Sequence, residues 1–224
     1  MKDIVKKSYT LLIENAKEIA LLCFPFLVLH IANELVGSMA KTTLIRYATY
    51  TIDLIIKAVF IPSLLIFFAT IIRKKQQGIK NTVYNGMVYA PYILVTYIII
   101  TSPAIIFALS NQYMNLAFSL TFFIVYMFFI IKTSFTSQLI VFEEFKPFDA
   151  IKNSFKFTEN YSTTIIFSVI IASLPFVILT TLISRSESLA FIYYILSFVT
   201  HLVVETTLFV VYYKSYQARN PIKA

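Results

Sequence analysis

Six apolar stretches, each long enough to cross a lipid bilayer, constrain this chain more than any other feature of its sequence. They lie at residues 19–38, 49–72, 90–110, 116–142, 163–184 and 189–214. A hydrocarbon core about 30 Å thick needs about 20 apolar residues of helix to cross it. Unpaired backbone groups are costly in lipid, and the alternating pattern of a β-barrel is missing. The sequence therefore predicts an all-α fold, a polytopic bundle of six transmembrane helices.

The composition places the whole chain in the membrane class. Of the 224 residues, 58% are hydrophobic and only 13% are charged, whereas about 25% are charged in an ordinary soluble domain. We therefore expect one transmembrane domain over residues 1–224. A cleaved signal peptide is an alternative for the first stretch, because Ser38-Met39-Ala40 resembles a cleavage site. Glu14, Lys17 and Glu18 precede the apolar run and favour a span.

The distribution of basic residues predicts the orientation of the bundle. With the N-terminus inside, fourteen Lys and Arg residues fall on the cytoplasmic side, and only Lys41, Arg46 and Arg185 fall on the other side. Basic residues are retained in the cytoplasm, so both termini are expected there. The net charge of +8 then reflects topology and attraction to anionic lipid headgroups. It gives no support to a nucleic-acid partner.

A short phrase recurs at three places along the chain. Asp3-Ile4-Val5-Lys6-Lys7-Ser8-Tyr9 aligns with Asp149-Ala150-Ile151-Lys152-Asn153-Ser154-Phe155, and a weaker copy is Gly78-Ile79-Lys80-Asn81-Thr82-Val83. The span that follows each copy contains a proline: Pro25, Pro103 or Pro175. The sequence therefore predicts three tandem units, about 1–73, 74–145 and 146–224. Each unit would have an amphipathic helix, an outward span kinked at its proline, and a returning span.

The three phrases predict short basic helices at the cytoplasmic face. Their lysines are expected to contact anionic headgroups: Lys6, Lys7, Lys80, Lys152 and Lys156. Asp3 and Asp149 are the expected N-caps of the first and third helices. Each helix either bends into the headgroup plane or continues into the next span, and Asn15, Asn85 and Asn160 favour the bend.

The phrase Phe148-Asp149-Ala150-Ile151-Lys152-Asn153-Ser154-Phe155 lies between two spans, and the second of these contains a proline. In this it resembles the cytoplasmic signature of YciC-type bacterial inner-membrane proteins and of the related membrane domain attached to some glycerophosphodiester phosphodiesterases. The resemblance implies a multi-pass protein of the bacterial inner membrane and no particular reaction. The phosphodiesterase domain itself is missing from this chain.

Motifs for catalysis are missing as well. The sequence has no Gly-rich phosphate loop, no Walker lysine motif, no His-Glu-x-x-His and no nucleophile elbow. A single cysteine, Cys23, excludes an intrachain disulfide and a cysteine metal site. We therefore expect a protein that is not an enzyme and that has no cofactor and no metal.

Ionisable residues inside the predicted spans are the strongest candidates for a functional site. Each costs about 2.5 to 3.5 kcal/mol at bilayer depth on insertion scales unless it is paired or hydrated. These residues are His30, Glu34, Asp53, Lys57, Lys132, His201 and Glu205. One interpretation is a set of ion pairs that hold the bundle together, with Asp53 simply wetted at the outer surface. The alternatives are a path for a proton or small solute, and a metal bound by His30, Glu34, His201 and Glu205.

Estimated depth suggests how six of these residues pair. Antiparallel first and sixth spans would place His30 beside Glu205 and His201 beside Glu34. Lys132 and Lys57 would then neutralise the two carboxylates. The sequence favours a scaffold or regulatory protein that acts on lipids or on a partner membrane protein. A small transporter or channel that uses the polar network is the alternative.

Overall fold

A computed structural model gives the fold of this protein and describes residues 2–39, 42–73, 77–110, 116–159, 161–183 and 189–219. The helices are α1 Lys2–Glu14, α2 Ala16–Ser38, α3 Thr43–Ile72, α4 Ile79–Ser110, α5 Leu116–Lys132, α6 Thr136–Glu143, α7 Pro147–Thr158, α8 Ser162–Ile183 and α9 Ala190–Arg219. The described residues contain no strand. Six helical segments are long and apolar enough to cross a membrane. The predicted all-α, six-span fold is confirmed.

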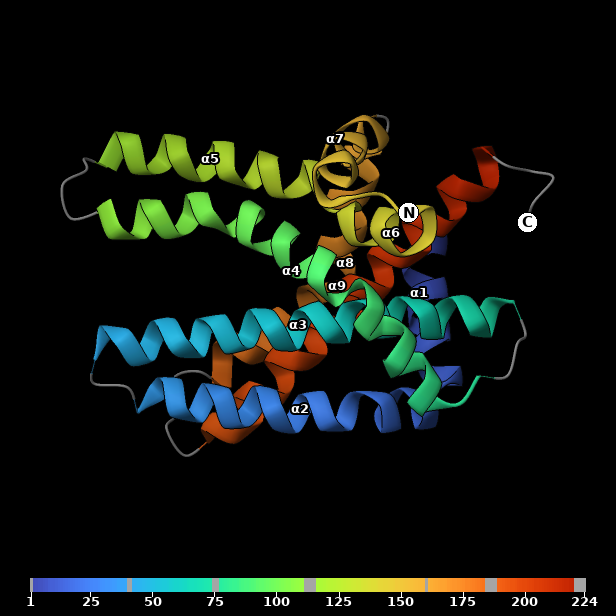
Figure 1. The fold of residues 1–224 in the computed structure, drawn as a ribbon, viewed down its shortest axis with the longest axis horizontal. Helices are drawn as coiled ribbons and strands as arrows, with labels where there is room; N and C mark the ends of the chain where they lie inside the picture. Colours follow the sequence, from blue (N-terminus) through green and yellow to red (C-terminus); the bar gives the residue numbers. More distant parts are fainter. Residues whose placement is uncertain are drawn as a thin grey trace.

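Figure 1 shows how the spans are arranged. Helices α2 and α3 form one hairpin, α4 and α5 form a second, and α8 and α9 cross behind them. Helix α1 packs against α8 and α9. The start of α1 and the end of α9 lie at the same end of the bundle, which we call the terminal end. The end of α2 and the start of α3 lie at the opposite end.

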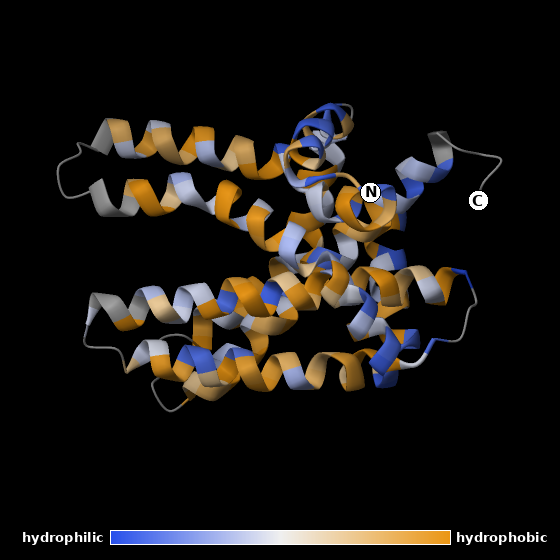
Figure 2. Cartoon of the chain, viewed as in Figure 1, coloured by the Kyte–Doolittle hydropathy of each residue, from blue (hydrophilic) through white to orange (hydrophobic). Residues whose placement is uncertain are grey.

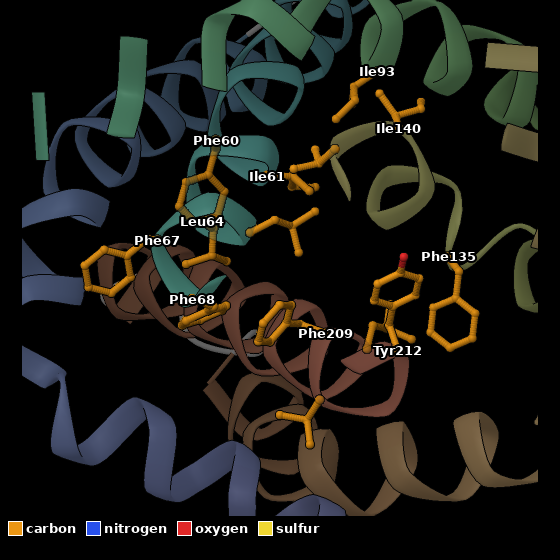
Figure 3. Packing of buried hydrophobic residues seen from close by; sticks show 14 of the residues in the cluster. Phe60, Ile61, Leu64, Phe67, Phe68, Ile93, Phe135, Ile140, Phe209 and Tyr212 are labelled. Carbon is orange, nitrogen blue, oxygen red and sulfur yellow. The ribbon is translucent and has the colours of Figure 1, made fainter. Parts of the chain in front are cut away.

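Helices α3 and α9 form the centre of the bundle. Half of the most apolar window of each is buried, against 11% for the span that contains α5. Their aromatic side chains meet in the terminal half of the molecule, where the ring centres of Phe68 and Phe209 are 5.3 Å apart. Tyr212 and Phe135 extend this cluster toward α6 (Figure 3). Phe157 of α7 packs against both of them, with ring centres 5.2 Å and 4.9 Å away. The core between α3 and α9 thus extends from Phe60 and Phe198, whose ring centres are 5.2 Å apart, to this aromatic cluster.

The basic phrases form separate helices in two of the three predicted units. A break at Asn15 separates α1 from α2, and the Asn15 side-chain amide donates to the carbonyl oxygen of Leu11 at 2.9 Å. A break also separates α7 from α8, near Asn160, which lies outside the described residues. At Asn85 the predicted bend is wrong, because α4 continues through this residue. The absence of a side chain at Gly86 lets the backbone of α4 approach Ser63 of α3 closely there.

The predicted N-caps are also wrong. Helix α1 begins at Lys2 and α7 at Pro147, so Asp3 and Asp149 lie inside the first turn. A carboxylate at this position still interacts favourably with the unpaired N–H groups of the helix start. Proline suits the first position of α7, because it lacks an N–H that would have no partner there.

Helix α1 is held by the bundle itself. Ile4 and Ser8 are buried, and the Tyr9 hydroxyl donates to the carbonyl oxygen of Ala172 in α8 at 2.6 Å. Burial raises the pKa of Tyr9 above its ordinary value. The apolar face of this amphipathic helix is thus used at least partly for packing against α8 and α9.

The fourth span is interrupted about two thirds of the way along its length, and this break was not predicted from the sequence. The span is divided into α5 and α6 by a turn at Thr133–Phe135. Ser154 of α7 bridges this turn, since its hydroxyl donates to the carbonyl oxygen of Lys132 at 2.8 Å and accepts from the Phe135 N–H at 3.2 Å. Backbone groups freed inside a membrane need such partners. Ser154, which belongs to the third copy of the recurring phrase, thus supplies the hydrogen bonds that the broken span needs.

The helix order fits the predicted tandem units only in part. The first and third units share the order of short helix, span and span, whereas the second has no separate short helix and has a broken second span. The hydroxyl residues at the equivalent place in the three phrases, Ser8, Thr82 and Ser154, are all buried. The internal repeat stays a prediction. Helices α2, α4 and α8 continue through Pro25, Pro103 and Pro175, and the predicted kinks stay predictions too.

Candidate functional site

A cavity of about 330 Å³ lies between α3, α4, the α5–α6 turn and α9. Its charged and imidazole groups come from α3 and α9: Asp53, Lys57, His201 and Glu205. Its hydroxyl groups come mainly from α4 and the broken span: Tyr50, Tyr97, Thr101, Thr133, Ser134, Thr136 and Ser137. Phe60, Ile61 and Leu208 line the cavity and belong to the hydrophobic core as well. The cavity therefore adjoins the core, with polar groups concentrated around it at membrane depth.

Asp53 of α3 is the centre of the charged group. One carboxylate oxygen, Oδ2, lies 2.7 Å from Lys57 Nζ, one helical turn along α3. The other, Oδ1, lies 3.5 Å from His30 Nδ1 on α2. The Asp53 side chain is only 14% exposed. The interpretation of Asp53 as a residue wetted at the outer surface is therefore wrong, since it is buried and paired.

The structure does not contain the pairs that depth suggested. The partner of His30 is Asp53, and His30 also contacts Phe198 of α9, with ring centres 5.9 Å apart. Within the described part of the chain, no ion pair joins His30 to Glu205 or His201 to Glu34. Depth along a helix does not determine pairing, because the rotation of each helix about its axis decides which side chains face each other. The expected contact between the first and sixth spans is present, because α2 packs against α9.

Lys132 lies apart from the other charged groups. Its ammonium group is 5.4 Å from the ring centre of Phe128, an exposed residue of the same helix. Its backbone carbonyl, at the end of α5, is the group that Ser154 bonds. The predicted role of Lys132 as the partner of Glu205 is therefore wrong. A cation over an aromatic face gains a favourable interaction without a carboxylate.

His201 and Glu205 are brought together on α9 as expected from their spacing, and both line the cavity. Glu34 is half-buried and lies near His30 and Asp53. Of the six predicted network residues, three line the cavity: Lys57, His201 and Glu205. His30 and Glu34 do not line it but lie next to Asp53, which does. Lys132 belongs to neither group. Figure 2 shows hydrophilic turns on the otherwise apolar ribbons of α2 and α3, where these helices run side by side.

The sequence missed the hydroxyl groups around the cavity. Thr133, Ser134, Thr136 and Ser137 follow one another closely at the break of the fourth span. A single hydroxyl residue is common in a transmembrane helix and indicates nothing by itself. Only the clustering of these four residues could have indicated a polar site in the sequence. The Ser134 hydroxyl is buried without a hydrogen-bond partner, although it borders the cavity. Irregular backbone at membrane depth is typical of a segment that lines a cavity.

The lysines expected to contact lipid are all exposed: Lys6, Lys7, Lys80, Lys152 and Lys156. They belong to α1, α4 and α7. Their exposure is compatible with headgroup contact, and the contact itself stays a prediction.

Comparison of this chain with known protein families, with curated proteins and with solved structures gave no match. The geometry of the cavity is therefore the basis on which a function can be argued.

Proposed function

We propose that this protein is a small membrane transporter that conducts protons, alone or with a small polar solute, through the cavity between α3, α4 and α9. The observation that carries the proposal is that charged groups from two central helices converge on a cavity at the break of a span. Buried ionisable groups are costly in a membrane and mark ion and substrate pathways there. This reverses the order favoured by the sequence, in which a scaffold came first.

The arrangement of the cavity supports a proton path with a bound solute. Glu205 is half-buried and has no ion pair within the described residues, so its carboxyl group is available to a proton or to a solute cation. Elsewhere on the cavity wall, Lys57 and the hydroxyl groups of the fourth span can bind an anionic or polar group of the solute. The packed aromatic side chains around Phe68 and Phe209 would form the barrier on the terminal side. A transporter needs such a barrier on one side of its site.

The test is proton flux into liposomes that contain the purified protein. A potassium diffusion potential supplies the driving force, and an enclosed dye reports the internal pH. We expect flux well above that of protein-free liposomes, and its loss in Glu205→Gln. The control is Glu144→Gln, because Glu144 is exposed and lies outside the cavity. Flux equal to that of protein-free liposomes, or equal flux with Gln at position 205, would show that the proposal is wrong.

The topology and the class of the protein are part of the proposal. The terminal end, with its exposed lysines, would face the cytoplasm of a bacterial cell, and the protein would be a non-enzymatic YciC-like member of the inner membrane. The charge asymmetry supports this orientation.

A role for the terminal end in binding anionic lipid, or a partner membrane protein, is the second candidate. The exposed lysines of α7 favour it, because Lys152 and Lys156 both point away from the buried residues Ala150 and Ser154. Each basic residue near an anionic surface contributes about 1 kcal/mol. The double change Lys152→Gln with Lys156→Gln should reduce co-purification of anionic over zwitterionic lipid with the full-length protein. An unchanged lipid ratio would exclude this role for α7.

A further inference from the structure

We propose that His30, Glu34 and Asp53 form a binding site for a first-row divalent transition-metal ion, in the chemical class of Zn²⁺, Mn²⁺, Fe²⁺ and Co²⁺. His30 and Glu34 lie one turn apart on α2, so they share one helix face. Asp53 faces them from α3, and one ligand atom of each residue lies within 4.8 Å of the other two. The set differs from the sequence alternative, which joined His30 and Glu34 to His201 and Glu205.

The distance between His30 and Asp53 fits metal ligands better than it fits a hydrogen bond. Nδ1 and Oδ1 are 3.5 Å apart, and Asp53 Oδ1 is buried without a hydrogen-bond donor. Two ligands about 2.1 Å from a tetrahedral metal ion are separated by about 3.4 Å. Glu34 then has to move inward to complete the ligand set, since the three ligand atoms lie within 4.8 Å of one another.

Burial provides a second argument for a ligand. Asp53 Oδ1 is buried and has no hydrogen-bond partner, and a buried polar atom without a partner is unfavourable. A metal ion between His30 Nδ1 and Asp53 Oδ1 would give this oxygen a partner. His30 itself is only 6% exposed, so the ion would be held away from solvent. The helices are fixed at this level, since the Asn33 amide donates to the carbonyl oxygen of Thr49 at 2.8 Å.

The ligand types limit the metal. One imidazole nitrogen and two carboxylate oxygens suit borderline divalent ions, whereas Ca²⁺ and Mg²⁺ prefer oxygen alone and Cu⁺ prefers sulfur. Three protein ligands leave one position for water or an exchangeable ligand, as in open rather than closed metal sites. The site is therefore suited to an ion that enters and leaves.

Lys57 gives the site a built-in competitor. Its ammonium group lies 2.7 Å from Asp53 Oδ2, so it partly neutralises the carboxylate that would bind the metal. A divalent ion beside this ammonium is repelled, and binding should improve when the charge is removed. A purely structural role for the cluster predicts no gain in metal affinity, because loss of Lys57 would then only leave Asp53 without its partner and lower the stability of the protein.

The experiment uses the full-length, tag-free protein in detergent micelles after treatment with a chelator. Co²⁺ is added, and its visible absorption bands report protein ligands. We expect one Co²⁺ per chain, displaced by Zn²⁺, with affinity at least about 100-fold lower in His30→Gln. We expect affinity at least about tenfold higher in Lys57→Met. The control is His201→Gln, which removes the other histidine and should leave Co²⁺ binding unchanged.

Three results would overturn the site. They are no Co²⁺ bands in the natural protein, equal binding in His30→Gln, and weaker binding in Lys57→Met while that variant remains monodisperse. The measurement is made without a membrane gradient, so it is independent of proton flux. Metal binding without proton flux would refute the proposed transport but support the metal site. Proton flux without metal binding would refute the metal site but support the proposed transport.

Discussion

The Asp53–Lys57 pair is the most direct test of how this bundle tolerates charge in its interior. Replacing Lys57 by Met removes the cation that lies 2.7 Å from the Asp53 carboxylate. Asp53, with a side chain only 14% exposed, then keeps a negative charge that no lysine compensates. We expect Lys57→Met to destabilise the protein, and the addition of Asp53→Asn to restore most of the lost stability.

The magnitude follows from the burial of the two side chains. Removing one partner of a fully buried pair costs about 3 to 5 kcal/mol. The Lys57 side chain is 32% exposed, so solvent screening lowers this figure, and we expect about 2 to 3 kcal/mol. With Asn at position 53 the stranded charge is gone, and the cost should fall to about 1 kcal/mol. The expected coupling energy between the two positions is therefore about 1 to 2 kcal/mol.

The assay is unfolding of the purified protein by dodecyl sulfate in mixed micelles, followed by circular dichroism. Lys132→Met is the matched control, because Lys132 is also an intramembrane lysine but has no carboxylate partner within the described residues. Its loss should cost less than about 1 kcal/mol. Additive effects of the two changes at positions 53 and 57, or a larger loss in Lys132→Met, would refute the assignment of Asp53 as a buried paired charge.

Two further predictions concern the packing that positions the cavity. Gly86→Ala should lower the free energy of unfolding in detergent by about 1 to 3 kcal/mol, because the new Cβ would lie 2.8 Å from Ser63 N and 2.9 Å from Ser63 Cα. Gly78→Ala is its control, since nothing lies within 4 Å of a Cβ there, and equal stability of the two variants would show that α3 and α4 do not need this close approach. Ser154→Ala should cost about 1 to 3 kcal/mol, because the Lys132 carbonyl and the Phe135 N–H lose their bridge at the broken span. Ser215→Ala, which removes a buried hydroxyl bonded within its own helix, should cost less, and a reversed order would contradict the bridging role.

The six spans could be predicted because membrane insertion is a local property of the sequence. Each stretch of about 20 apolar residues is favourable in lipid by itself. The predicted 49–72 and the observed Tyr47–Ile72 differ by only two residues. The break at Asn15 was also local, since this side chain caps the end of α1. Asn85 has the same side chain, yet α4 continues through it, because packing against α3 outweighs the local preference.

The sequence also identified the ionisable residues of the site, since any charge inside a span is conspicuous. It could not identify their partners. His30 meets Asp53 instead of Glu205 because contacts depend on the rotation and tilt of α2, α3 and α9, which no single helix determines. The break in the fourth span is likewise tertiary, because the turn before α6 is stable only with Ser154 of another helix beside it. Hydropathy along the chain thus determined which segments enter the membrane, and packing between the segments decided which polar groups share a cavity.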